Sequence, residues 1–274
     1  MSQPHLAFIG GGNMARSLIG GLVRRGHAPS RISVSEPQAA AREALAAEFG
    51  VAVHAGNAEA ALGAGLLVLA VKPQVMREVC AELRATVAAS RPLVLSIAAG
   101  VRIGQFERWL GAGAAVVRAM PNTPALIGAG VSGLVANAAA TPAQRRAAEA
   151  VLACAGSIVW LADEAQMDAV TAVSGSGPAY FFLLVEALQD AARAQGLPAA
   201  AARELVLATA LGAARMAAEG VEEAAVLRAR VTSPGGTTQA ALDVFEAGGL
   251  RPLVAAAVAA ATARGRELSD AYKD

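Results

Sequence analysis

The stretch His5-Leu-Ala-Phe-Ile-Gly-Gly-Gly-Asn-Met-Ala15 decides the fold expected for the first part of this 274-residue chain. Residues 5–9 have the apolar character of a short strand, and a helical pattern follows to about Gly26. Between them stands Gly10-x-Gly12-x-x-Ala15, in which Gly10 permits a tight turn, Gly12 lets the backbone approach a pyrophosphate, and Ala15 permits close helix–strand packing. The helix start adds free N–H groups for phosphates. The stretch predicts a dinucleotide site; an ordinary glycine-rich turn is the alternative.

Strand and helix patterns alternate through the rest of the first half. The continuous apolar run Leu66–Val71 is typical of a parallel strand covered on both faces. The alternation predicts a Rossmann-type, doubly wound parallel sheet in a domain of residues 1–162. We expect strands at 5–9, 31–35, 51–53, 66–71, 93–97, 114–118, 130–135 and 157–161, and further helices at 38–49, 58–62, 73–89, 103–110 and 142–154.

Beyond residue 162 the strand patterns stop and the chain reads almost wholly as helix. The expected helices are 164–195 (with a glycine interruption), 199–219, 223–230, 239–247 and 251–272. A helical half of ~110 residues is thin for an independent core. We therefore predict that residues 163–274 form an all-helical dimerisation and substrate domain that packs against a second copy.

Composition excludes several classes of protein. The formal net charge is +1 and no basic block occurs, so we expect no nucleic-acid partner. Two distant cysteines, Cys80 and Cys154, and three scattered histidines build no metal or disulfide framework. The charge-free stretch 252–263 is shorter than the ~20 residues that span a bilayer. The chain enters its first strand directly, which leaves no room for a signal peptide. We expect a cytoplasmic protein without a metal.

An acidic residue, Glu36, ends the second expected strand. It lies at the distance from Ala15 at which such a residue accepts a hydrogen bond from the adenine ribose and favours NAD. No arginine adjoins it in the sequence to accommodate a 2′-phosphate, because Arg42 is a turn and a half into the next helix. We expect a weakened preference for NADP. The alternative is a solvated carboxylate at a helix start.

Three further strand ends carry small or polar residues. Lys72-Pro73 follows the strand 66–71, Ser96-Ile-Ala-Ala-Gly100 ends the next, and Met120-Pro-Asn-Thr-Pro124 comes after the one that follows. Ligands bind at the carboxyl ends of strands in open α/β sheets. Lys72 is also one of only two lysines, the other being Lys273, so a mechanism that needs a lysine has one plausible candidate. Each segment taken alone is equally consistent with a plain loop.

Two glycine-rich segments interrupt the helical half. Ser174-Gly-Ser-Gly-Pro178 breaks the first long helix and predicts a polar loop; a simple kink is the alternative. Ser233-Pro-Gly-Gly-Thr-Thr238 predicts a loop whose N–H groups converge on a small anion. Thr237 fits the role of N-cap for the helix 239–247. That leaves the Thr238 hydroxyl for contact with a substrate.

With these residues in place, the chain resembles the pyrroline-5-carboxylate reductase family. The segments that carry the resemblance occur in family order along essentially the whole chain: Phe8–Met14, Ala70–Pro73, Ser96–Gly100, Arg118–Pro124, Asp168–Tyr180 and Ser233–Thr238. The dinucleotide turn is shared with many families, whereas the last two segments are not. The resemblance implies reduction of 1-pyrroline-5-carboxylate to L-proline by NAD(P)H, the last step of proline biosynthesis. It also implies a dimer, or dimers assembled into a ring, with the active site near the subunit interface.

Together with the motifs, the resemblance supplies candidate site residues. The candidate coenzyme contacts are Gly10, Gly11, Gly12, Asn13, Met14, Ser35, Glu36, Asn57, Ala70, Val71, Lys72, Pro73, Ala98, Gly100 and Asn122. The candidate substrate contacts are Ser233, Gly235, Gly236, Thr237, Ser176 and Glu164, and the candidate catalytic residues are Thr238 and Lys72. Thr238 is expected near the ring nitrogen of the substrate. The family commonly prefers NADPH and often has a small hydroxyl or amide residue at the position of Glu36, so NADPH and NADH both remain open.

Three other functions fit parts of the pattern. A β-hydroxyacid dehydrogenase of similar build needs a lysine on its central helix, and residues 164–195 contain none. A broader imine reductase leaves the loop 233–238 without an anion. A dinucleotide-sensing or pyridoxal-handling protein is the non-enzymatic alternative.

Overall fold

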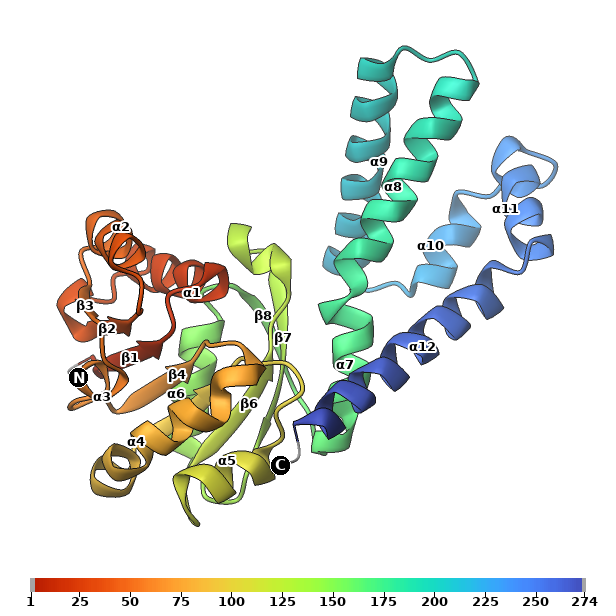
Figure 1. The fold of residues 1–274 in the computed structure, drawn as a ribbon. Coiled ribbons are helices and arrows are strands. Elements are labelled where there is room, and N and C mark those ends of the chain that lie inside the picture. The colour runs from red at the N-terminus through yellow and green to blue at the C-terminus, as the bar shows by residue number, and fades with distance from the viewer. Residues whose placement is uncertain (1–2, 273–274) are drawn as a thin grey trace. The chain divides into compact units, whose positions relative to one another are not determined.

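The computed structural model describes residues 3–272, which form two compact units (Figure 1). The first unit runs through Ser176 and takes in the end of the chain from Ala261 onward. The second unit is Gly177–Ala260. The division into domains 1–162 and 163–274 stays a prediction.

A single eight-stranded sheet forms the centre of the first unit. Its strand order is β3-β2-β1-β4-β5-β6-β7-β8, which places the N-terminal strand in the interior of the sheet. The strands are β1 (Leu6–Ile9), β2 (Ile32–Ser35), β3 (Ala52–His54), β4 (Leu66–Leu69), β5 (Leu93–Ser96), β6 (Val116–Met120), β7 (Gly130–Ala136) and β8 (Gly156–Trp160). The Rossmann-type architecture expected from the sequence is confirmed.

One strand departs from the expected direction. β7 pairs with β6 in the antiparallel sense, whereas the other neighbouring strands are parallel. The connection between them, residues 121–129, holds only the 3₁₀ helix η3 (Thr123–Ile127). A parallel pair needs a crossover of about a dozen residues or more, which this connection is too short to provide. β7 is thus the antiparallel strand of the doubly wound, mainly parallel sheet.

Helices cover both faces of the sheet, and each face has its own apolar core. In β1, Leu6 and Phe8 pack toward α1, α2 and α6, whereas Ala7 and Ile9 pack toward α3, α4 and α5. This alternation is the period of a strand buried on both faces. The helices are α1 (Asn13–Arg24), α2 (Ala39–Phe49), α3 (Asn57–Ala60), α4 (Met76–Ser90), α5 (Ile103–Leu110) and α6 (Pro142–Leu152).

The first unit extends past the sheet into helical structure. It includes the 3₁₀ helix η4 (Glu164–Gln166), α7 (Met167–Val170) and the π-helical turn η5 (Thr171–Gly175). Met167 is fully buried in the core on the α4 side of the sheet, and Val170 packs against the same core. A Cβ at Gly133 in β7 would lie 2.7 Å from Val170 Cγ1, so glycine at this position lets α7 approach the sheet.

The second unit is helical, and its helices bury almost nothing within one chain. It comprises α8 (Gly177–Ala194), α9 (Ala199–Glu219), α10 (Ala224–Arg230), α11 (Thr237–Ala247) and the first part of α12 (Leu250–Ala271). Within residues 177–260 only Gly177 and Ala202 are buried. Phe181 and Phe182 are 70% and 67% exposed. An apolar surface of this kind marks an interaction site.

The helical run Glu164–Ala194 also has the length and apolar composition of a membrane span. Only 11% of its most apolar window is buried inside the chain. The pair α11 and α12 passes the same test only when joined across a 51° bend. A helix covered by a second subunit has this composition as well, because its apolar face must leave water on association.

Candidate active site

The carboxyl ends of the parallel strands align along one edge of the sheet. Ile9 is in register with Ser35 and Leu69, and Leu69 is in register with Ser96. The predicted coenzyme residues that follow β1, β2, β4 and β5 therefore share this edge.

The dinucleotide turn begins with a glycine that no other residue can replace without strain. Gly10 has φ +100°, and a Cβ there would lie 2.9 Å from the Ala70 carbonyl oxygen. Its N–H donates to the Ser35 carbonyl oxygen at 2.9 Å. Gly10 thus joins the ends of β1, β2 and β4 at a point where the backbones approach closely.

The start of α1 offers an anion site. Gly12 is the N-cap in extended conformation, no side chain caps the helix, and the first helical residues are Asn13 and Met14. A Cβ at Gly12 would meet no atom within 4 Å. The first turn of α1 thus has no side-chain cap and has open space beside Gly12, which fits a pyrophosphate on the helix N-terminus.

Glu36 lies directly beside this turn. Its Oε2 accepts from the Gly11 N–H at 3.2 Å, and its Oε1 accepts from the Gln38 N–H at 3.1 Å. The carboxylate at the end of β2 is thereby fixed next to the glycine turn, where a ribose hydroxyl would lie.

An arginine that the sequence placed at a distance also reaches this point. Arg42 Nη1 donates to the carbonyl oxygens of Glu36 and Pro37, each at 2.8 Å. The expectation that no arginine adjoins Glu36 was therefore wrong. The sequence does indicate this contact, because a long side chain in the first turn of a helix points back toward the helix N-terminus, where Glu36 lies.

Ser35 and Asn57 form a hydrogen-bonded chain on the other side of β2. Ser35 Oγ donates to Asn57 Oδ1 at 2.7 Å, and Asn57 Nδ2 donates to Glu82 Oε2 at 2.6 Å. Asn57 is the first residue of α3. The structure therefore brings these two predicted residues together and orients the Asn57 amide.

The loops after β4 and β5 carry the next predicted residues. Lys72 is exposed and precedes a 3₁₀ turn, η2 (Pro73–Val75), that begins with Pro73. Ala98 is 6% exposed, and its N–H donates to Ser96 Oγ at 3.3 Å. Gly100 has φ +82° and is buried. Ala70 and Val71 connect β4 to Lys72 and are half-buried.

Asn122 ties the loop after β6 to the π-helical turn. Its Nδ2 donates to the Ser174 carbonyl oxygen at 3.2 Å, and its Oδ1 accepts from the Val131 N–H at 2.9 Å. The segment Ser174–Pro178 was expected to form a loop. It instead continues the helix through η5 and into α8, with the Ser176 N–H donating to the Thr171 carbonyl oxygen at 2.8 Å.

The loop expectation was wrong because a glycine can widen a helical turn as well as end it. π-Helical turns inside helices frequently mark functional sites. A Cβ at Gly175 would lie 2.7 Å from Met120 Cε, so glycine lets this turn pack against the end of β6. Ser176 stands at the junction of the two helical segments and is half-buried.

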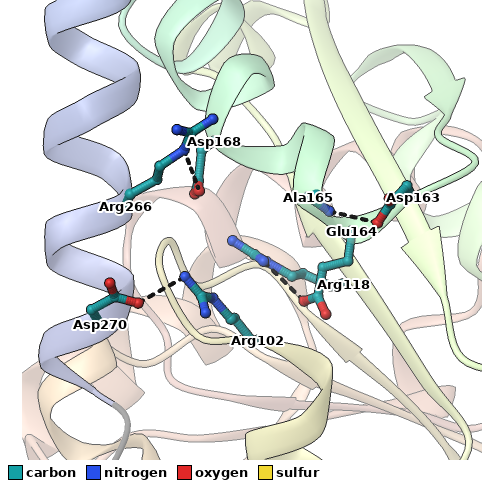
Figure 2. Close-up of a pocket in the computed structure, with 8 residues that line it drawn as sticks. All are labelled: Arg102, Arg118, Asp163, Glu164, Ala165, Asp168, Arg266 and Asp270. Atoms are coloured by element: carbon teal, nitrogen blue, oxygen red, sulfur yellow. Dashed lines mark hydrogen bonds and ion pairs between the residues drawn. The ribbon is translucent and has the colours of Figure 1, made fainter.

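Glu164 lines a charged cavity of about 450 Å³ (Figure 2). Its Oε1 pairs with Arg118 Nη1 at 2.9 Å and accepts from the Ile103 N–H at 2.8 Å. The Arg118 side chain is 5% exposed, so this pair holds a buried charge in place. The cavity is lined by Arg102, Arg118, Asp163, Glu164, Ala165, Asp168, Arg266 and Asp270.

The glycine loop of the second unit forms a separate backbone site. Gly235 has φ +71°, and the Gly236 N–H donates to the Ser233 carbonyl oxygen at 3.0 Å, which closes a turn. α11 then begins with Thr237 and Thr238, and Gly236 is its N-cap. The expectation that Thr237 caps this helix was wrong. No side chain caps α11, so its first N–H groups are available to an anion.

The two cysteines are buried and free. Burial raises the pKa of the Cys80 thiol to about 12, so it carries a proton at neutral pH. Across residues 3–272, no three His, Cys, Asp or Glu side chains gather where they could hold a metal ion.

Two protein-family models match this chain. The family model described as pyrroline-5-carboxylate reductase dimerisation matches residues 164–268. The model described as NADP oxidoreductase, coenzyme F420-dependent, matches residues 5–100.

Relatives of known name match over nearly their whole length. The pyrroline-5-carboxylate reductase of Pseudomonas aeruginosa is 52% identical over 98% of each chain. That of Haemophilus influenzae is 43% identical over 99% of this chain and all of its own.

Two solved structures share the fold over the full chain. A pyrroline-5-carboxylate reductase from Coxiella burnetii has a TM-score of 0.94 at 43% identity, covering 97% of this chain and 99% of its own. The Plasmodium falciparum pyrroline carboxylate reductase, with NADP bound, has a TM-score of 0.86 at 28% identity, covering 98% and 99%. The chain belongs to the pyrroline-5-carboxylate reductase family.

Proposed function

We propose that this chain reduces 1-pyrroline-5-carboxylate to L-proline by hydride transfer from NAD(P)H. The observation that carries the proposal is that two glycine-rich turns, Gly10–Gly12 and Gly235–Gly236, each lead into a helix without a side-chain cap, α1 and α11. Each offers backbone N–H groups to an anion. A dinucleotide pyrophosphate and a small carboxylate are the two anions that this reaction brings together.

The chain's part in the reaction is to bind and orient. NAD(P)H, when bound, would supply the hydride that converts the protonated imine to the amine, with the hydride adding to C5 and the double-bond electrons going to nitrogen. We assign the binding of the nicotinamide to residues at the carboxyl edge of the sheet, including Lys72, Ala98 and Asn122. Correct positioning can supply ~7–11 kcal/mol of the barrier, so a site of backbone donors and hydroxyls is sufficient.

We assign the substrate carboxylate to the start of α11. Ser233 and the backbone of Gly235, Gly236 and Thr237 hold the carboxylate, with its charge favoured by the helix dipole. The roles of Ser176 and Glu164 as substrate contacts stay predictions. Coupled oxidation of NADPH by pyrroline-5-carboxylate tests the function, and absence of turnover with both coenzymes would contradict it.

Thr238→Ala should lower kcat far more than it weakens NADPH binding. The Thr238 hydroxyl is assigned to the ring nitrogen of the substrate, which becomes an amine during hydride transfer. Losing one hydrogen bond to a group whose charge changes in the transition state costs about 1.5–3 kcal/mol, or about 10- to 100-fold in kcat. Steady-state kinetics and coenzyme titration measure both effects. An unchanged kcat would refute the assignment.

Glu36→Ala should raise the ratio of kcat/KM for NADPH to that for NADH by about tenfold, which corresponds to ~1.4 kcal/mol. The Glu36 carboxylate, fixed by the Gly11 and Gln38 N–H groups, repels a 2′-phosphate. The Arg42 guanidinium would attract the same phosphate.

Arg42→Ala is the matched control and should shift the ratio in the opposite direction. Values of kcat/KM measured with NADPH and with NADH for the parent and both variants test these two expectations. Equal ratios in the parent and Glu36→Ala would remove Glu36 from coenzyme selection.

We further propose that the working form is a homodimer or a larger ring in the cytoplasm. The apolar surface of α8, α9, α11 and α12 supports association, since one chain leaves it uncovered. The dimerisation model matched at residues 164–268 supports the same conclusion. The active site would then lie near the boundary between subunits. Light scattering of the purified protein measures the assembly, and a monomer would contradict it.

A further inference from the structure

We propose that Tyr272 is a positioning residue that connects the loops after β4 and β5, which line the proposed coenzyme site. The inference deepens the coenzyme site proposed above and rests on it. The proposal is based on the end of α12, which returns to the sheet and contacts the loops after both β4 and β5.

Three contacts of Tyr272 carry the proposal. Gln74 Nε2, in the turn that follows Lys72-Pro73, donates to the Tyr272 hydroxyl at 3.2 Å. The Tyr272 ring lies against Gly100, where a Cβ would sit 3.3 Å from ring Cε2. Gln105 Nε2 donates to the Tyr272 carbonyl oxygen. One residue thus links the loop after β4, the loop after β5 and the start of α5.

The residues that receive Tyr272 are themselves fixed. Gln105 is 2% exposed, and its Oε1 accepts from the Arg102 N–H at 2.7 Å. Arg102 Nη2 in turn pairs with Asp270 Oδ1 at 2.9 Å, two residues before Tyr272. The end of α12 is therefore held by Arg102 in the loop after β5 and by Gln105 in α5, and Tyr272 extends that support to Gln74.

The geometry also explains the glycine at position 100. Gly100 has φ +82° and no Cβ, so the tyrosine ring can lie directly on the backbone of the loop. Beside this contact, a cavity of about 90 Å³ is lined by Pro73, Gly100 and Ser269. Pro73 of the loop after β4, Gly100 of the loop after β5 and Tyr272 thus border the same cavity.

The contacts of Tyr272 fix the positions of loop residues that we assign to coenzyme binding. Lys72 and Pro73 precede Gln74, and Ala98 precedes Gly100 by two residues. A displacement of about 1 Å in a site of this kind can cost about a hundredfold in rate. Tyr272 touches neither substrate nor coenzyme in this assignment and acts through the two loops.

The test compares Tyr272→Ala with Tyr272→Phe in the full-length protein. Tyr272→Ala should lower kcat/KM for NADPH by about 10- to 100-fold and weaken NADPH binding measured without substrate. Tyr272→Phe keeps the ring on Gly100 and should retain at least about a third of the parent value. Arg264→Ala is the control, since its exposed pair with Glu267 lies on the same helix and contributes little.

A structural role alone would lower the melting temperature without changing kinetics or coenzyme affinity at 25 °C, and that result would overturn the proposal. If Tyr272→Ala does not fold, Gln74→Ala and Tyr272→Phe remove the same contact from opposite sides. Each should then raise KM for NADPH by about two- to threefold, and the double variant should go no further. Additive effects would overturn the proposal.

Failure of the proposed function has a different signature. A parent that binds NADPH but does not reduce pyrroline-5-carboxylate contradicts the function, while the NADPH titrations still decide the role of Tyr272.

Discussion

Gly12→Ala is expected to weaken NAD(P)H binding by at least about a hundredfold while leaving the fold intact. At Gly12 the backbone has φ −69° and ψ −179°, which alanine adopts without strain, and a Cβ there meets no protein atom within 4 Å. The methyl group would instead occupy the space at the start of α1 that a pyrophosphate needs. A hundredfold loss corresponds to ~2.8 kcal/mol, comparable to one or two charge-assisted hydrogen bonds. Coenzyme fluorescence titration measures the affinity, and thermal unfolding measures the fold.

Gly10→Ala provides the contrast. Its φ of +100° and the Ala70 carbonyl oxygen 2.9 Å from the added Cβ mean that this variant should lose stability as well as coenzyme. Comparing the two variants thus separates the effect on folding, expected for Gly10→Ala, from the effect on coenzyme binding alone, expected for Gly12→Ala. Parent-like NADPH affinity in a folded Gly12→Ala protein would show that no phosphate approaches the backbone at this turn.

Thr237→Pro is expected to raise KM for pyrroline-5-carboxylate by about 10- to 100-fold with little change in NADPH affinity. Proline at the first helical position removes one N–H without disturbing the helix, because that N–H has no partner inside the helix. Gly236 precedes it with φ −82° and ψ 175°, an extended conformation that proline tolerates before it. The expected loss is that of one hydrogen bond to a charged group, about 1.5–3 kcal/mol.

Thr237→Ala is the matched control for this variant. It removes the hydroxyl and keeps the N–H, so it should bind the substrate nearly as well as the parent. Similar KM values for the proline and alanine variants would mean that the Thr237 backbone does not hold the carboxylate. A rise in KM for both would transfer the role from the N–H to the hydroxyl.

The candidate site could be predicted from the sequence wherever its geometry is local. Gly10, Gly12 and Ala15 set their own turn through neighbouring torsion angles, so their pattern predicted both the turn and the helix after it. The sequence also places the residues after β4 and β5 at the carboxyl edge of the sheet, because a polar or small residue at the end of an apolar strand indicates that edge. Their role as coenzyme contacts stays a prediction. The short connection 121–129 held a further signal, since its length excludes a parallel crossover to β7.

Details that depend on side-chain reach or on helix register were predicted less well. The sequence separates Arg42 from Glu36 by six positions, but the Arg42 side chain reaches back to the Glu36 carbonyl oxygen. The sequence predicts Thr237 as the cap of α11, but Gly236 takes that position and no side chain caps the helix. It predicts a loop at Ser174–Pro178, whereas the π-helical turn keeps the chain helical.

The sequence by itself determined the order of strands and helices, the dinucleotide turn and the glycine loop before α11. Each of these depends on residues within a few positions of one another, whose periodicity and torsional preferences are written in the local pattern. Only the tertiary structure decided that Asn122 holds the π-helical turn, that Arg118 neutralises Glu164, and that Tyr272 meets Gln74 across 198 positions of chain. Such contacts form only when the whole chain has folded, because packing of the two apolar cores brings the partners together. Neither partner's neighbouring residues in the sequence indicate the contact.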